Sequence, residues 1–202
     1  MTEYLKGKDA ALMIAGLSLA TFMQVLDSTI ANVALPAIAG HLGASVSQGI
    51  WVVTFFMVFN AASIPLTGFL SKRIGEVRLF LISVTLFIVA SLLCGLSTNL
   101  VMLIIARVFQ GLVSGPMIPL AQSLLLRNTP LERRSMAMGL FGIVIMIAPV
   151  LGPILGGYIS DNYYWGWIFF INVPIGLLSL ALCWIILKRH ETEKESVPVD
   201  YV

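Results

Sequence analysis

Six long apolar blocks dominate the chain, and short polar segments separate them. The blocks cover residues 10–36, 49–70, 79–97, 100–126, 136–159 and 167–187. Each holds about 20 residues or more, the length that a helix needs to cross a hydrocarbon core of about 30 Å. None alternates with the two-residue period of transmembrane barrel strands. Because lipid leaves only helices and closed barrels as spanning structures, the pattern predicts an all-α membrane protein with a six-helix bundle.

Composition supports this fold class. Hydrophobic residues make up 58% of the chain and charged residues only 11%. A soluble domain carries about 25% charged residues, so the few charges here would not cover a water-exposed surface. Cys94 and Cys183 both lie inside apolar blocks, which indicates buried thiols rather than a disulfide framework.

The positions of the basic residues predict the orientation. Apart from Arg107, every Lys and Arg lies before the first block, in every second connection, or after the last block: Lys6, Lys8, Lys72, Arg73, Arg78, Arg127, Arg133, Arg134, Lys188, Arg189 and Lys194. Basic connections stay on the cytoplasmic side of a membrane. We therefore expect a six-helix domain over residues 1–187 with both termini in the cytoplasm, followed by a cytoplasmic linker over 188–202.

Two ionisable side chains lie deep inside the blocks, Asp27 in the first and Arg107 in the fourth. Each costs on the order of 2.5–3.5 kcal/mol at a helix centre, so such residues persist where they face a partner or a cavity. With a rise of 1.5 Å per residue, Asp27 lies about 24 Å from the cytoplasmic side and Arg107 about 20 Å from it. The two charges are thus expected at nearly the same depth.

Small and polar residues share the helix faces of these two charges, which predicts a water-filled interior lined by Gln24, Ala31, Gln110, Gly111 and Ser114. Two interpretations remain open for the pair. In one, Asp27 and Arg107 form a static ion pair that holds two helices together. In the other they form a proton site, because burial favours a neutral carboxyl and a nearby guanidinium favours the carboxylate. Motion that separates the pair would then take up a proton.

The fifth block has an unusual density of proline and glycine. Its run APVLGPILGG holds Pro149, Gly152, Pro153, Gly156 and Gly157. The spacing of Gly152 and Gly156 allows close approach of another helix. The two prolines bend a helix and release backbone carbonyls.

The connection between the second and third blocks, GFLSKRIGEVR, predicts a tight, shaped turn. Its notable residues are Gly68, Lys72, Arg73, Gly75 and Glu76. Nowhere does the sequence show a nucleotide-binding loop, a metal-ligand cluster or a nucleophile triad. We therefore expect no enzyme, no metal or cofactor site, and no nucleic-acid partner.

Five stretches, in order along nearly the whole chain, resemble motifs of the major facilitator superfamily, specifically of its fourteen-helix, EmrB-like branch of multidrug:proton antiporters. The stretches are LDSTIANVALP (26–36), GFLSKRIGEVR (68–78), RVFQGLVSGP (107–116), APVLGPILGGYISD (148–161) and WGWIFFINVPIG (165–176).

The resemblance implies the N-terminal half of a transporter that exports amphipathic drugs in exchange for protons by alternating access. It implies proton coupling by Asp27 and Arg107, a cytoplasmic gate at 68–78, and an exporter motif at 148–161. Lys72 stands where the wider superfamily usually has an acid, and Glu76 where it usually has a base. This exchange would preserve an ion pair with inverted sign.

Members of this branch are much longer, so the chain is interpreted as a truncated frame or as a half-transporter that pairs with a missing C-terminal half or a second copy. The face at 149–157 is expected to be left uncovered for that partner. Other expected partners are membrane lipid, small amphipathic drugs, protons and, in a Gram-negative cell, a periplasmic adaptor and an outer-membrane channel. Two alternatives stay open: a truncated or regulatory fragment that packs with other membrane chains without transport, and an importer of the same fold.

Overall fold

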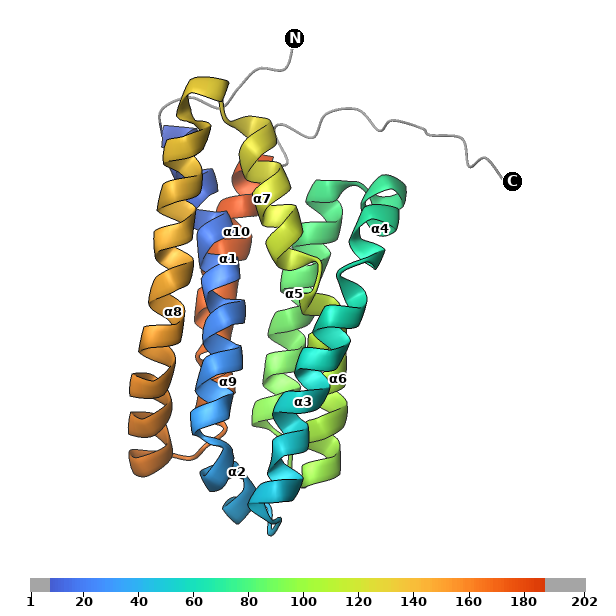
Figure 1. The fold of residues 1–202 in the computed structure, drawn as a ribbon, viewed down its shortest axis with the longest axis vertical. Coiled ribbons are helices and arrows are strands. Elements are labelled where there is room, and N and C mark those ends of the chain that lie inside the picture. Colours follow the sequence, from blue (N-terminus) through green and yellow to red (C-terminus); the bar gives the residue numbers. More distant parts are fainter. Residues whose placement is uncertain (1–7, 188–202) are drawn as a thin grey trace, which may run out of the picture.

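The computed structural model describes residues 8–187, which form a bundle of helices that run lengthwise beside one another (Figure 1). Within these residues six helices are long and apolar enough to cross a membrane. The first, third and fifth of the predicted spans correspond to α1 (Lys8–Val33), α5 (Glu76–Gly95) and α8 (Arg134–Asn162). The linker predicted at 188–202 lies outside the described residues.

Three of the predicted spans are interrupted next to a proline. After α1 the chain continues as α2 (Leu35–His41), α3 (Val46–Ser63) is followed by α4 (Leu66–Ile74), and α6 (Leu100–Ser114) is followed by α7 (Met117–Asn128). The interruptions fall beside Pro36, Pro65 and Pro116. Proline lacks an amide hydrogen and its ring clashes with the preceding turn, so the helix breaks or bends there. The structure therefore differs from the unbroken helices predicted over 10–36, 49–70 and 100–126, because each range is divided between two helices.

Local signals in the sequence account for several other helix ends. Ser45 caps α3 with a reciprocal pair of hydrogen bonds to Gln48, and Asn99 caps α6 by accepting from the amide of Met102. Gly75 separates α4 from α5 with a φ of 96°, a conformation that glycine adopts without strain. A short 3₁₀ turn, η1 (Leu131–Arg133), leads into α8.

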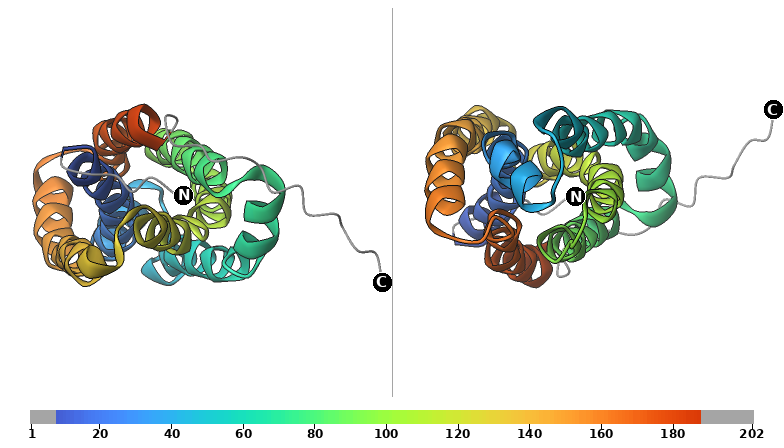
Figure 2. Two further views of the ribbon diagram at one scale, coloured as in Figure 1. Left: turned by 90° about the horizontal axis from the view of Figure 1, so that it is seen from above. Right: turned by 90° about the horizontal axis from the view of Figure 1, so that it is seen from below.

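The last span is built from two pieces, α9 (Trp167–Phe170) and α10 (Asn172–Leu187), and it lies against α1. Seen from either end, the spans form two groups (Figure 2). In one group α8 and α10 pack along α1, and in the other α3 and α5 pack along α6. Contacts of α10 with α5, and of α1 with α7, join the two groups. The centre of the bundle is therefore lined by α1, α5, α6 and α10.

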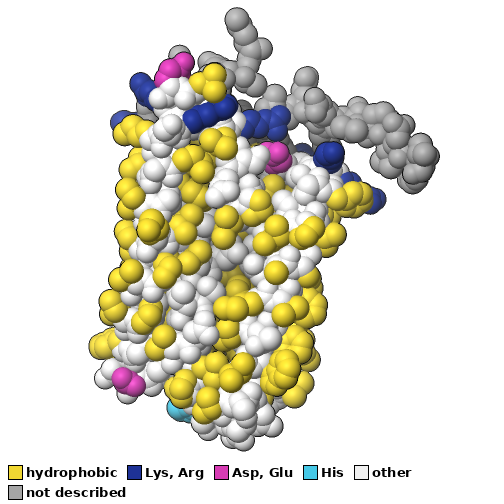
Figure 3. All heavy atoms as spheres, in the orientation of Figure 1, with side chains coloured by type: hydrophobic (Ala, Val, Ile, Leu, Met, Phe, Trp, Pro, Cys, Tyr) yellow, Lys and Arg dark blue, Asp and Glu magenta, His cyan; other side chains and the backbone are white. Residues whose placement is uncertain are grey.

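The outer surface of the bundle is apolar over most of its length, whereas the described Lys and Arg side chains in view gather at one end (Figure 3). Large apolar side chains such as Val101, Met146 and Ile185 are more than 60% exposed. Polar side chains, by contrast, lie buried in the interior. An apolar exterior of this extent needs lipid around it, so the chain is a membrane protein.

The glycine face of α8 is covered within this chain. A Cβ added at Gly152 would collide with the side chain of Thr29, and one added at Gly156 would lie 3.0 Å from the carbonyl oxygen of Ile30. Both glycines thus allow α8 to approach α1 closely. The expectation that the whole face at 149–157 is left for a second half is wrong for these two positions. Pro149 and Pro153 of the same helix are exposed.

Candidate functional site

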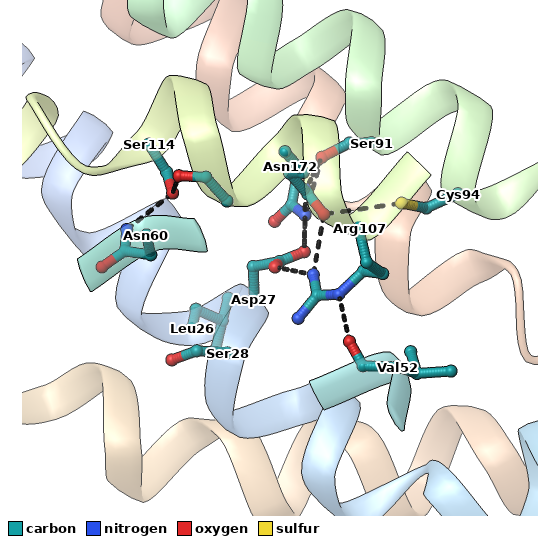
Figure 4. A network of polar contacts seen from close by, with 12 residues as sticks. Leu26, Asp27, Ser28, Val52, Asn60, Ser91, Cys94, Arg107, Ser114 and Asn172 are labelled. Atoms are coloured by element: carbon teal, nitrogen blue, oxygen red, sulfur yellow. Dashed lines mark hydrogen bonds and ion pairs between the residues drawn. The ribbon is translucent and has the colours of Figure 1, made fainter. Parts of the chain in front are cut away.

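The two charges predicted at equal depth meet in the middle of the bundle. Asp27 projects from α1 and Arg107 from α6, and Nη1 of the guanidinium lies 2.5 Å from Oδ2 of the carboxylate (Figure 4). Both side chains are fully buried. Asp27 and Arg107, which the sequence predicts at nearly the same depth in the membrane, are therefore in direct contact.

Two further amides hold the other oxygen of the carboxylate. Asn172 of α10 donates from Nδ2 to Asp27 Oδ1 at 2.6 Å, and Gln110 of α6 donates from Nε2 to the same oxygen at 3.3 Å. Both amides also donate to the hydroxyl oxygen of Ser91 on α5, at 3.2 and 2.7 Å. The carboxylate thus connects three spans, α1, α6 and α10, and each of its direct partners donates an N–H group to it. Ser91 extends the network to α5.

The guanidinium of Arg107 is fixed on several sides. Nε donates to the carbonyl oxygen of Val52 at 3.3 Å, and Nη1 donates to Gln110 Oε1 at 2.7 Å. The ring of Phe56 lies 4.0 Å from the guanidinium carbon, a cation–π distance, and that of Phe169 lies 5.5 Å away. Nη2 is buried with no hydrogen-bond partner. An unpaired charged donor inside a protein is costly, so the guanidinium is not fully satisfied by the side chains around it.

The residues predicted to line a cavity lie in different surroundings. Gln24 lines a pocket between α1, α3 and α7. Ala31 is fully buried in a cluster of apolar side chains, and Ser114 accepts a hydrogen bond from Asn60. A Cβ at Gly111 would lie 2.5 Å from the carbonyl oxygen of Phe56, so this glycine allows α6 to pack on α3. Gln110 belongs to the buried network around Asp27.

The residues predicted to form a cytoplasmic gate lie together at the basic end of the bundle. Lys72 and Arg73 are exposed in the last turn of α4, and Gly68 has open space around its α-carbon. Glu76 opens α5, where its carboxylate accepts a hydrogen bond from Ser123 of α7 at 3.2 Å. Its Oε2 also lies 3.6 Å from Nη1 of Arg127. The acid that stands in place of the usual base therefore contacts a base on the fourth span.

Asn172 and Ser91 are the members of the network that sequence reasoning missed. Both are neutral polar residues in apolar blocks, where they attract less notice than a charge. The signal that could have found Asn172 is the amide itself: a polar side chain inside a membrane span needs a hydrogen-bond partner. Among residues 8–187, no three His, Cys, Asp or Glu side chains gather closely enough to hold a metal ion.

Comparison with known proteins places this arrangement in a family. Residues 17–199 match the profile of the Major Facilitator Superfamily. The chain belongs to this superfamily. As a member of a superfamily of transporters it is not an enzyme. A solved structure of similar fold is that of a bacterial homologue of the human lysosomal transporter Spinster, in an inward-facing, unoccupied conformation. The TM-score is 0.72 at 18% identity, over 94% of this chain and 44% of that one.

Relatives of much higher identity carry export or resistance in their names. The chain is 61% identical over 198 residues to multidrug export protein EmrB of Haemophilus influenzae and 54% identical over 198 residues to fatty acid resistance protein FarB of Neisseria gonorrhoeae. Both matches cover 98% of this chain and 39% of the relative. Multidrug resistance protein 3 of Bacillus subtilis is 38% identical over 179 residues, which are 89% of this chain and 35% of that protein. The chain thus spans about two fifths of the length of these relatives.

Proposed function

We propose that this segment forms one half of a membrane exporter that moves amphipathic drugs outward in exchange for protons by alternating access. The observation that carries the proposal is the buried contact between Asp27 and Arg107, which joins α1 to α6 at the centre of the bundle. The identity of 61% to a multidrug export protein supports the direction and the class of cargo.

The geometry around Asp27 suits a carboxylate that gains and loses a proton. In the observed state its oxygens accept from three N–H groups, those of Arg107, Gln110 and Asn172. Donors of this kind favour the ionised form. A movement of α6 relative to α1 would remove the guanidinium and leave a buried carboxyl, and burial favours the protonated form. Opening and closing of the contact is thereby coupled to proton uptake and release.

The remaining motifs take the roles that the resemblance assigns to them. The segment 68–78 acts as a cytoplasmic gate in which Glu76 contacts α7. The close contact of Gly152 and Gly156 with α1 lets α8 move as one body with the helix that carries Asp27. The second half of the cavity comes from a C-terminal domain or a second copy. In a Gram-negative envelope a periplasmic adaptor and an outer-membrane channel would complete the path.

The test is an Asp27→Asn variant in membrane vesicles that contain the exporter in its full-length context. Asparagine keeps the shape of the side chain and cannot take up a proton at neutral pH. We expect drug-driven proton release to fall to the level of empty vesicles. Asp9→Asn is the matched control, because Asp9 is an exposed carboxylate in the first turn of the same helix. This control is expected to leave proton release unchanged.

The two interpretations of the ion pair give opposite results in this assay. A purely structural pair predicts that Asp27→Asn protein, once shown to be folded and inserted, still releases protons when drug is added. Normal proton release from folded Asp27→Asn protein would therefore overturn the proposal.

A further inference from the structure

The direct partners of Asp27 come from two different groups of spans. Arg107 and Gln110 both project from α6, which packs with α3 and α5. Asn172 projects from the start of α10, which packs along α1, the helix that carries Asp27 (Figure 4). A movement of α6 that removes the guanidinium therefore removes the amide of Gln110 as well. Asn172 is the direct partner that stays beside Asp27.

A protonated Asp27 needs a different kind of partner from the ionised one. A carboxylate only accepts hydrogen bonds, whereas a carboxylic acid also has one O–H to donate, and the guanidinium of Arg107 has no acceptor atom. Oε1 of Gln110 already accepts from Arg107 Nη1 at 2.7 Å and from Cys94 Sγ at 3.5 Å. The hydroxyl oxygen of Ser91 already accepts two amide N–H groups, which occupy both of its lone pairs. None of these three partners therefore has an acceptor left for the acid.

Asn172 carries an acceptor atom that the observed state leaves unused. Its side chain is fully buried, and its Oδ1 has no hydrogen-bond partner within residues 8–187. Its Nδ2, by contrast, donates to Asp27 Oδ1 at 2.6 Å and to Ser91 Oγ at 3.2 Å. Half a turn about the Cβ–Cγ bond exchanges the two amide atoms with almost no change in shape. After that turn, Oδ1 of Asn172 lies where the O–H of a protonated Asp27 would meet it.

We propose that Asn172 is a positioning residue of the proton site, whose amide donates to the ionised Asp27 and turns to accept from the protonated Asp27. This inference rests on the proposed function and adds a residue that holds both states of the proton carrier. Protonation forms one O–H bond on Oδ1 of Asp27 with a proton from the aqueous phase, and no other covalent bond changes. The turn places Nδ2 where Oδ1 had no partner. The amide therefore keeps one unpartnered group, while the acid gains the acceptor whose absence would cost free energy.

Few ionisable side chains face this network, so a change with pH can be assigned to Asp27. Asp27 and Arg107 are the only buried Asp, Glu, Lys, Arg or His side chains within residues 8–187. Cys94 of α5 is an ionisable neighbour through its contact with Gln110. The helices α8 and α9, which also pack on α1, bring no buried charged side chain.

Infrared difference spectroscopy of the purified protein in lipid nanodiscs tests the proposal without changing Asn172. Spectra in acidic and in alkaline buffer show the carboxyl groups that gain a proton, and the band of Asp27 is the one that Asp27→Asn removes. A second sample carries carbon-13 in the side-chain amide of asparagine, which identifies asparagine bands. We expect an asparagine C=O band to shift to lower wavenumber when Asp27 gains its proton, because Oδ1 changes from unpartnered to accepting. That shift should be absent in Asp27→Asn protein.

The variant Asn172→Leu removes both the donor and the acceptor while keeping similar bulk. A carboxylic acid whose O–H has lost its acceptor absorbs at higher wavenumber, so the Asp27 acid band should move upward and the asparagine shift should vanish. The matched control is Asn60→Leu, because Asn60 of α3 is a half-buried amide that donates to Ser114 at 2.7 Å rather than to Asp27. The control should keep both the position of the acid band and the asparagine shift.

A purely structural Asn172 gives different spectra. An amide that remains a donor in both states predicts no downward shift of an asparagine C=O band when Asp27 gains its proton. It also predicts the same position of the Asp27 acid band in Asn172→Leu as in the unchanged protein. Either result would overturn the proposal. If Asn172→Leu protein does not fold, the asparagine band of the unchanged protein decides alone.

Failure of this inference and failure of the proposed function give distinguishable results. An acid band that Asp27→Asn removes, together with an asparagine band that does not shift, would support the proton site and overturn the role of Asn172. Spectra in which Asp27→Asn removes no acid band would show that Asp27 takes up no proton. That result would overturn the proton site and, with it, the role of Asn172.

Discussion

At Asp27, one carboxylate inside the membrane is tolerated because three N–H donors from two other spans surround it. A buried ion pair of this kind contributes little net stability compared with well-packed apolar residues, since desolvation offsets the attraction. Removing one partner lowers the free energy of unfolding strongly, because it leaves the other charge buried and uncompensated. The pair is therefore expected to be strongly coupled in any measurement of stability.

The substitution Arg107→Leu tests this coupling. We expect it to lower the free energy of unfolding by about 3–5 kcal/mol, because Asp27 is left without its cation. The double variant Asp27→Leu/Arg107→Leu should recover most of that loss, since no charge remains buried. Unfolding of the chain in detergent micelles with increasing denaturant gives the four free energies of the cycle.

Arg127→Leu is the control for this series. Arg127 also approaches a carboxylate, that of Glu76, but its side chain is 61% exposed. An ion pair at such a site contributes about 0–1 kcal/mol. If Arg107→Leu costs no more free energy of unfolding than Arg127→Leu, Asp27 and Arg107 are not coupled as the structure indicates. The same conclusion follows if the double variant loses the sum of the losses in Asp27→Leu and Arg107→Leu.

At the scale of a helix, α8 has one face packed against α1 and another that is exposed. Gly152 and Gly156 face α1 at close range, whereas no other side chain comes within 4 Å of a Cβ placed on Gly157. Pro149 and Pro153 lie in the same helix and remain exposed. The glycines therefore bring the helix that carries Asp27 and its neighbour together, and the exposed side of α8 is available to lipid or to a second half.

The same substitution at two glycines of α8 should have opposite effects. Gly152→Ala places a Cβ 2.7 Å from that of Thr29, and such overpacking costs about 1–3 kcal/mol. Gly157→Ala meets open space, so the better helix propensity of alanine should stabilise the chain by about 0.5–1 kcal/mol. Thermal unfolding in detergent measures both. A shift of the same sign at both positions would contradict the close contact of α8 with α1.

The proline breaks show what an apolar pattern cannot report. Hydropathy at 49–70 reflects only that the segment is long enough to span a membrane, and it has the same value for a straight helix and a bent one. The break after Ser63 depends on Pro65 and on how α3 and α4 pack, which the pattern does not contain. The six spans could be predicted because a bilayer imposes length, whereas the bends are set by local backbone chemistry.

At the scale of the whole molecule, the common depth of Asp27 and Arg107 in the membrane could be predicted because a helix has a fixed rise per residue. The participation of Asn172 and Ser91 could not, because it depends on how α10 and α5 are rotated against α1. The same limit applies to Gly111, whose small size suggests a cavity and in fact allows α6 to pack on α3. Sequence periodicity places a residue on a face of its own helix, and only packing decides what that face meets.

Orientation in the membrane is the property of the whole molecule that the charges predict most directly. The described Lys and Arg side chains in view gather at one end of the bundle, which predicts that this end faces the cytoplasm (Figure 3). Cysteine labelling on intact cells tests this, because Cys94 and Cys183 are fully buried and give a low background. Ser47→Cys at the start of α3 and Glu132→Cys in η1 place exposed thiols at opposite ends of the bundle.

A membrane-impermeant maleimide should label Ser47→Cys on intact cells and should label Glu132→Cys only after the membrane is permeabilised. Labelling of Glu132→Cys on intact cells, with protection of Ser47→Cys, would reverse the orientation. Reversal would also contradict the proposed export mechanism, because the segment 68–78 would then lie on the outer side, where it would not act as a cytoplasmic gate. The labelling pattern therefore tests the orientation and the assignment of the gate together.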